Sequence, residues 1–578
     1  METNQRLAEL KDYVEEENNL STREIAKRSL VPLFKMILFR SMMLSFSNSV
    51  AVSNALVMTM LTVGVTWSPI LAGCLRLAGS LASLSIMDSL GRKIPGSVWA
   101  LVIAGLLIPM AVATDSWFNI LDRHKMSSVV AMWISLHVID GLFAPITSVY
   151  MGVFIFISAG MSLAQSVGWS DINADRHFLY SWFIAVALGA LVSILLGYVL
   201  PKKFIMASSA VLILAGGIIF ASAPRNIDAL VAARYLNGMA VGLAITTYLI
   251  YASELSRNRI RGVCLGLEQF SLSLGIAIQM ITTSQWDVMS SFSVNCLHGI
   301  LDIIMAILAA GSLIYFIESP VDFVRLGNDT AALECLSQLQ QNPSITMETN
   351  RRLEELKHYV QEQEYLSPRE LLQRSLISLL KMLFFRSALL AFTYSAILTS
   401  LLAYSTQLIG FTWTPILAAC LRIIGSGMTL VIIDNMGRKL PASIWALIMG
   451  GLMVPMAVIV THSMNLLNSH KMSTVVSLWI CMQFFAGLYA PVSSAYMGES
   501  FPLRTKAFCM AVCVIVEQII QIVIISQVSI GNDGSLMAMG IMILISAAAF
   551  FVTMPETKKI TLREAQERFV NLLNLKMF

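Results

Sequence analysis

Residues 413–461 read WTPILAACLRIIGSGMTLVII, DNMGRKLP and ASIWALIMGGLMVPMAVIVT in succession, two apolar runs on either side of a charged turn. Each run has about twenty residues, enough for a helix to cross roughly 30 Å of hydrocarbon. The turn brings Asp434, Arg438 and Lys439 to the point where the chain leaves one run and enters the next. Because backbone groups in lipid must bond within the chain, both runs are predicted to be membrane-spanning helices.

The composition extends this prediction to the whole chain. Its 578 residues are 56% hydrophobic and only 13% charged, whereas soluble domains carry about 25% charged residues. We therefore expect an all-α polytopic membrane protein whose first partner is the lipid bilayer. The sequence has no block of basic residues interleaved with aromatics, the pattern that would indicate nucleic-acid binding. No catalytic constellation, P-loop or Cys-x-x-Cys pair is present, so neither an enzyme nor a cofactor is expected.

From residue 153 onward the apolar runs form two groups of six. They are separated by one long polar segment, which predicts a six-helix bundle in 153–320, a linker in 321–376 and a second bundle with a tail in 377–578. The spans of the first bundle are expected near 153–168, 180–200, 204–222, 229–251, 263–283 and 296–316, and those of the second near 378–404, 413–433, 442–461, 473–496, 507–528 and 535–553.

A repeat precedes the first bundle. Residues 1–152 realign without a gap on residues 347–498, with about half of the pairs identical. The front copy is therefore predicted to duplicate helices seven to ten of the later unit, with spans near 36–62, 67–87, 96–114 and 127–149. A genuine tandem duplication and a joining of two neighbouring genes both explain it.

Basic residues predict the orientation. Alternate loops hold nearly all Lys and Arg, and the opposite loops from residue 153 onward hold only Arg176, Arg225 and Lys471. By the positive-inside rule, both termini and the long linker are expected in the cytosol, with the plasma membrane as the expected location.

Four motifs at the ends of predicted helices resemble those of a known protein family. They are Arg234-x-x-x-Gly238 with Glu254 to Arg261-Gly262, Asp434-Asn-Met-Gly-Arg-Lys439, Glu499-Ser-Phe-Pro502 and Pro555-Glu-Thr-Lys-Lys-Ile-Thr-Leu562. In this order they resemble the sugar-porter branch of the major facilitator superfamily, closest to insect glucose and trehalose facilitators. The resemblance implies two six-helix bundles that rock about a solute site between them.

The same motifs predict a cytosolic gate. Single exposed ion pairs contribute about 0–1 kcal/mol, so a network is needed to hold a closed state. Plain positive-inside anchoring is the alternative explanation. The predicted gate residues are Arg234, Glu254, Arg261, Asp434, Gly437, Arg438, Lys439, Glu499 and Glu556.

The resemblance also implies a substrate site. Glu268-Gln269 followed by Gly275 fits the family's helix-five pattern, so Gln269 is the expected sugar-binding amide, with helix packing as the alternative role. In helix ten, Pro491 is kept but Ser494 stands where the family has tryptophan, and the paired glutamines of helix seven are missing. These departures remove a stacking surface and hydroxyl partners that the family uses for hexoses.

Three ionisable residues are predicted at membrane depth: Asp302, Arg422 and Glu517. Because charges in the bilayer are costly, we expect them to be functional. One hypothesis is an internal pair between Arg422 and an acid, which couples protons or binds an anionic group. Snorkelling or a wet cavity is the alternative.

Together these observations predict a transporter of a sugar or related small polar solute, facilitative or proton-coupled, that works by alternating access. A non-transporting sensor on the same scaffold and a carrier of another organic solute are the alternatives.

Overall fold

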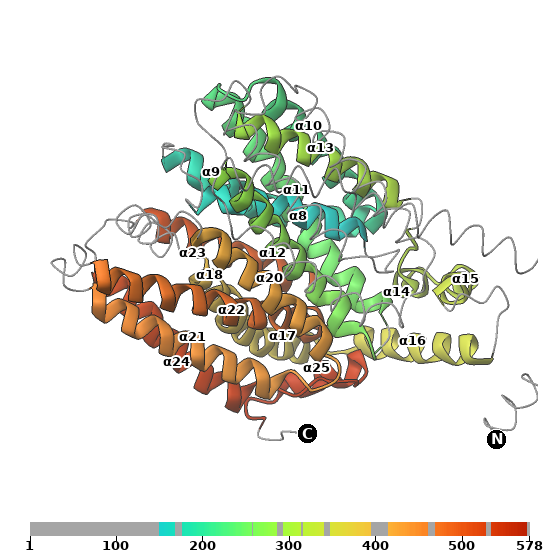
Figure 1. Ribbon diagram of the computed structural model, residues 1–578. Helices are drawn as coiled ribbons and strands as arrows, with labels where there is room; N and C mark the ends of the chain where they lie inside the picture. The colour runs from blue at the N-terminus through green and yellow to red at the C-terminus, as the bar shows by residue number, and fades with distance from the viewer. Residues whose placement is uncertain are drawn as a thin grey trace, which may run out of the picture. The chain divides into compact units, whose positions relative to one another are not determined.

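The computed structural model describes residues 150–167, 176–256, 258–285, 293–313, 316–339, 347–394, 414–460, 469–526 and 533–574. The four spans predicted in the front copy lie outside these ranges. The described residues belong to one compact unit of the chain, and its elements in those ranges are all helical (Figure 1).

Six helices follow the junction with the front copy. They are α8 (Tyr150–Ser166), α9 (Arg176–Val199), α10 (Lys202–Ser222), α11 (Ile227–Leu255), α12 (Arg261–Gln285) and α13 (Val294–Ser312). The last three residues of the front copy thus belong to the same helix as the apolar residues that follow. Gly152 lies so close to Tyr248 of α11 that an added Cβ would be 2.3 Å from its ring.

A second group forms the later half. It comprises α17 (Pro368–Met382), the π-helix η4 (Leu383–Ala388), α18 (Leu389–Thr393), α20 (Thr414–Ile432), α21 (Lys439–Val460), α22 (Ser469–Ser500), α23 (Lys506–Ser526) and α24 (Asp533–Thr553). Within the described ranges, eleven helical stretches are long and apolar enough to cross a membrane, and α8 is a shorter apolar helix of 17 residues.

Short helices occupy the polar linker and the tail: α14 (Pro320–Arg325), α15 (Asp329–Leu339), α16 (Met347–Tyr365) and α25 (Leu562–Val570). The linker and the tail are joined, because Tyr359 and Gln566 hydrogen-bond to each other at 3.0 Å. The start of α17 forms a capping box. The Ser367 hydroxyl accepts from the Glu370 N–H, and the Glu370 carboxylate accepts from the Ser367 N–H.

The two halves meet along α12 and α9. The helix α12 packs against α20 and α22, while α9 packs against α23. Large apolar side chains such as Leu195, Val211 and Ile545 are 59–68% exposed, as expected for side chains that face lipid. Polar and charged side chains are instead buried between the helices, and they form the site described next.

Candidate functional site

The charged turn after α20 is built around Gly437. Its φ of +96° lies in the left-handed region, and a Cβ there would stand 2.8 Å from Glu556. Only glycine adopts such a conformation readily. The turn lets the Glu556 carboxylate accept the backbone N–H groups of Arg438 (2.9 Å) and Lys439 (3.1 Å). The tail is thereby fastened to the turn.

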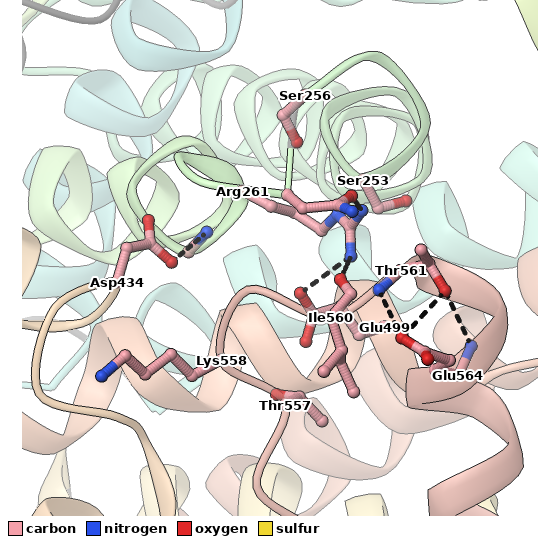
Figure 2. A network of polar contacts seen from close by, with 12 residues as sticks. Ser253, Ser256, Arg261, Asp434, Glu499, Thr557, Lys558, Ile560, Thr561 and Glu564 are labelled. Atoms are coloured by element: carbon pink, nitrogen blue, oxygen red, sulfur yellow. Dashed lines mark hydrogen bonds and ion pairs between the residues drawn. The ribbon is translucent and has the colours of Figure 1, made fainter. Parts of the chain in front are cut away.

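Arg438 is the centre of a buried ion network. Its guanidinium pairs with Glu499 and with Asp434, the latter at 3.0 Å. Arg261 approaches the same Glu499 at 3.5 Å from α12 and donates to the Ile560 carbonyl (Figure 2). Burial opposes the charge on Arg438, but Glu499 and Asp434 outweigh it and raise the pKa of Arg438 above its usual range.

The network ties the two halves together. Asp434 accepts the backbone N–H groups of Gly262 (3.2 Å) and Val263 (3.0 Å), which begin α12. Asp434 follows α20 in the later half, whereas α12 belongs to the first half. We call Arg261, Asp434, Arg438, Glu499 and Glu556 the charged-end network. Any separation of the halves at this end must break it.

Glu254 lies in a neighbouring cluster. It pairs with Lys202 at 2.8 Å, and Lys202 also pairs with Asp322 at 2.6 Å. Lys506 at the start of α23 donates to Ser253 at 2.5 Å, a further contact between the halves. Burial first, and then Glu254, raise the pKa of Asp322, although Lys202 opposes the shift.

Like Glu254, Arg234 and the side chain of Lys439 have their partners outside the charged-end network. Arg234 stands twenty residues before Glu254, about 30 Å along α11. It bonds Gln165 and Ser166 of α8 and the Phe178 carbonyl of α9. Arg234 therefore lies away from the charged-end network, and its place in a gate stays a prediction. Lys439 joins the turn through its N–H, but its ammonium donates to the Asn574 carbonyl in the tail.

A second polar layer lies deeper between the halves. Arg386 of η4 holds Glu268 of α12 by two bonds, at 2.9 and 3.2 Å, and donates to Ser494 at 2.6 Å. Ser494 also donates to Glu268. Glu517 of α23 is 3.6 Å from Arg386 Nε on the other side. One guanidinium thus faces two carboxylates, one from each half.

The layer continues from Glu268 toward α20. Gln269 donates to Glu268 at 2.8 Å and accepts from the Tyr394 hydroxyl at 3.2 Å. The Arg422 guanidinium makes a cation–π contact with the Tyr394 ring, and its Cζ lies 3.9 Å from the ring centroid. Arg422 in turn donates to Gln483 at 2.7 Å. We call these residues, with Arg386, Ser494 and Glu517, the buried polar chain.

The other predicted site residues have packing partners. Pro491 of α22 lies against Gly266 of α12, where an added Cβ would be 3.0 Å from its own Cβ. Asp302 lies within the first half, where it accepts from Ser158 and Asn237, each at 2.7 Å, and stands 3.3 Å from His298. Asp302 therefore bonds to α8, α11 and its own helix α13, and within the described residues no hydrogen bond or ion pair joins it to the buried polar chain.

The sequence did not single out Arg386 and Tyr394, although they link the predicted residues into one chain. Arg386 carries the signal that identified Arg422, a lone arginine in an apolar run. The same argument, that a charge at membrane depth is costly and therefore functional, would have identified Arg386 as well. Tyr394 has no such signal, because tyrosines are common in spans without a polar role.

A comparison with protein families matches residues 175–569 to the family described as sugar (and other) transporter. The chain belongs to this family. Because the match covers more than half of the chain and includes the helices of both bundles from α9 onward, the protein is a membrane transporter of the sugar-porter type.

Curated relatives agree with the family. A D-xylose-proton symporter-like protein of Arabidopsis thaliana is 24% identical over 431 residues, which cover 70% of this chain and 84% of the relative. The galactose-proton symporter of Escherichia coli K12 is 24% identical over 349 residues, which cover 58% and 72%.

Solved structures show the same fold. The proton:xylose symporter XylE of the major facilitator superfamily, bound to 6-bromo-6-deoxy-D-glucose, superposes with a TM-score of 0.57 at 17% identity over 73% of this chain and 98% of that one. A partially occluded inward-open form of XylE from E. coli gives 0.52 at 19% identity, over 71% and 96%. The expectation of a major facilitator fold is confirmed.

Proposed function

We propose that this transporter moves a sugar or related polyol across the plasma membrane by alternating access, with both termini and the linker in the cytosol. The observation that carries the proposal is the buried polar chain. It crosses from α12 of the first half to η4, α20, α22 and α23 of the second, at the depth where rocking bundles hold their solute.

Its amides suit this role. Gln269 and Gln483 each have donors and an acceptor, so they can bind hydroxyl groups in either direction. Tyr394 between them adds a ring and a hydroxyl. Gln269 bonds to Tyr394, and Gln483 bonds to Arg422, which lies over the Tyr394 ring. A sugar would replace those bonds, and its binding would loosen the contacts between the halves.

The charged-end network would act as the cytosolic gate. Arg438 and Asp434 move with the later half, whereas Arg261 and the start of α12 move with the first. Opening toward the cytosol would separate these partners and expose them to water, which replaces the lost hydrogen bonds. The same separation would part Glu268 from Arg386.

Uptake into proteoliposomes tests the proposal. The full chain, reconstituted and supplied with radiolabelled glucose, trehalose or a polyol, should accumulate at least one of them to equilibrium. Gln269→Ala should lower uptake about tenfold by raising KM, since it removes a hydroxyl partner. Gln373→Ala, at an exposed position in α17, is the matched control and should leave uptake unchanged.

Two results would count against the proposal. If the folded protein moves none of these solutes, a sensor on a transporter scaffold becomes the better interpretation. The orientation is tested separately with epitope tags at both ends of the chain in intact cells. Antibody binding without permeabilisation would contradict the cytosolic placement.

A further inference from the structure

Arg422 is a buried cation without an anion. It is fully buried in the middle of α20. Its two terminal nitrogens donate to Gln483 at 2.7 Å and Thr393 at 3.3 Å, and its Nε has no partner. Its guanidinium also lies over the Tyr394 ring. All of these groups are neutral, and no ion pair joins Arg422 to a carboxylate among the described residues.

The other buried arginines of the described ranges have either a carboxylate partner or a full set of hydrogen bonds. Arg261, Arg386 and Arg438 each pair with at least one carboxylate. Arg234 has no carboxylate, but all three of its nitrogens donate to oxygen atoms of α8 and α9. Arg422 lacks both a carboxylate and a full set of hydrogen bonds. Since an isolated buried charge is costly, an anion that pairs with Arg422 would stabilise the site.

The surroundings indicate which anion would fit. Arg422 touches Tyr394, which bonds Gln269 of the opposite half, so the cation lies beside the groups proposed to bind hydroxyls. A planar guanidinium binds a carboxylate by two parallel bonds. The two carboxylates of the buried polar chain, on Glu268 and Glu517, both face Arg386 instead.

We propose that the solute is a sugar acid, a hydroxyl-rich molecule with one carboxylate, which Arg422 binds while Gln269, Gln483 and Tyr394 hold its hydroxyls. The inference rests on the proposed sugar transport and narrows its substrate class. A single cation matches a singly charged carboxylate better than a phosphate ester, which carries about −1.5 to −2 charges at neutral pH.

The test compares D-glucuronate with D-glucose, which differ only at carbon six. In proteoliposomes with the full chain, glucuronate at equal low concentration should enter about tenfold faster than glucose. Arg422→Gln should lower glucuronate uptake about tenfold more than it lowers glucose uptake. Arg422→Lys keeps the charge but cannot bind a carboxylate by two parallel bonds. Its glucuronate uptake should lie between that of the wild type and that of Arg422→Gln. Arg369→Gln, exposed in α17, is the matched control.

The outcomes separate this inference from the proposed function. Uptake of glucose without glucuronate, or an equal loss of both in Arg422→Gln, would overturn the inference and leave sugar transport standing. Uptake of neither by the folded wild-type protein would overturn both. If Arg422→Gln does not fold, thermal unfolding of the wild-type protein decides. Glucuronate must then raise its Tm more than glucose does, and an equal or smaller rise would reject the inference.

Discussion

The guanidinium of Arg386 holds the carboxylate of Glu268 by two bonds, of 2.9 and 3.2 Å, across the boundary between the two halves. Both side chains are fully buried. Arg386 sits in a π-helical turn, a local widening that often occurs at functional positions. Glu517 shares the same cation at 3.6 Å. The contact between the halves therefore depends on one arginine that neutralises carboxylates from both sides.

Removing the Arg386 guanidinium alone should lower the free energy of unfolding more than removing both members of the Arg386–Glu268 pair. Arg386→Gln leaves two buried carboxylates without a cation, and we expect it to destabilise the protein by about 3–5 kcal/mol. The double variant Glu268→Gln/Arg386→Gln removes one of those carboxylates and should recover roughly half of the loss. Thermal unfolding in detergent measures both. A double variant as unstable as the sum of its single variants would show that the pair is not coupled.

Gly437 should not accept a side chain. Gly437→Ala places a Cβ 2.8 Å from Glu556 at a φ of +96°, and we expect a loss of about 1–3 kcal/mol. Gly451→Ala in α21 is the control, because no atom lies within 4 Å of its Cβ. Alanine there should leave stability unchanged or raise it by up to about 1 kcal/mol. Equal effects of the two substitutions on Tm would contradict the assignment.

The helix-end motifs predicted most of the charged-end network, and the reason is local. Asp434, Gly437 and Arg438 act within one turn, and their spacing in the sequence already sets the geometry of that turn. Glu499 and Glu556 could be added because each ends or follows a span at the same end of the bundle. Arg234 lies apart from this network because its motif names a helix without saying which end of that helix carries the role.

The deeper layer could not be predicted in the same way. Arg386 and Glu268 are 118 residues apart, and their meeting depends on how α12 packs against the later half. Hydrophobic periodicity places both residues in spans but does not fix the rotation of one helix against another. The sequence thus identified Glu268, Arg422 and Glu517 as separate residues. Only the packed helices show that Arg386 and Tyr394 join them.

Asp322 should make stability depend on pH. Its pKa in the folded protein is raised, chiefly by burial, so the folded state binds a proton at Asp322 more tightly than the unfolded state does. Its protonated form favours folding at low pH, and this contribution is lost as pH rises through the folded pKa. Asp322→Asn cannot ionise. The Tm of the variant minus that of the wild type should therefore increase from about pH 4 to pH 7. A difference that stays constant or shrinks would contradict this prediction.

Lys381 should fasten the tail to the bundle. Its ammonium donates to the carbonyls of Thr553, Phe569 and Asn571, at 2.9, 3.0 and 2.6 Å, and so joins α17 to the end of α24 and to the end of α25. Lys381→Met keeps most of the apolar stem but removes all three bonds. Hydrogen exchange of α25 should become about tenfold faster, the change that a loss of about 1.4 kcal/mol in local stability produces.

Arg369→Met tests whether the loss of any basic residue from α17 has the same effect, since Arg369 is exposed. We expect exchange in α25 to stay unchanged in that variant. The Glu556 carboxylate holds the charged turn, and Glu556 lies between α24 and α25 in the sequence. A loosened tail should therefore also weaken the gate, and uptake by Lys381→Met should fall while its solute KM is kept. A fall in uptake without faster exchange in α25 would separate Lys381 from the tail.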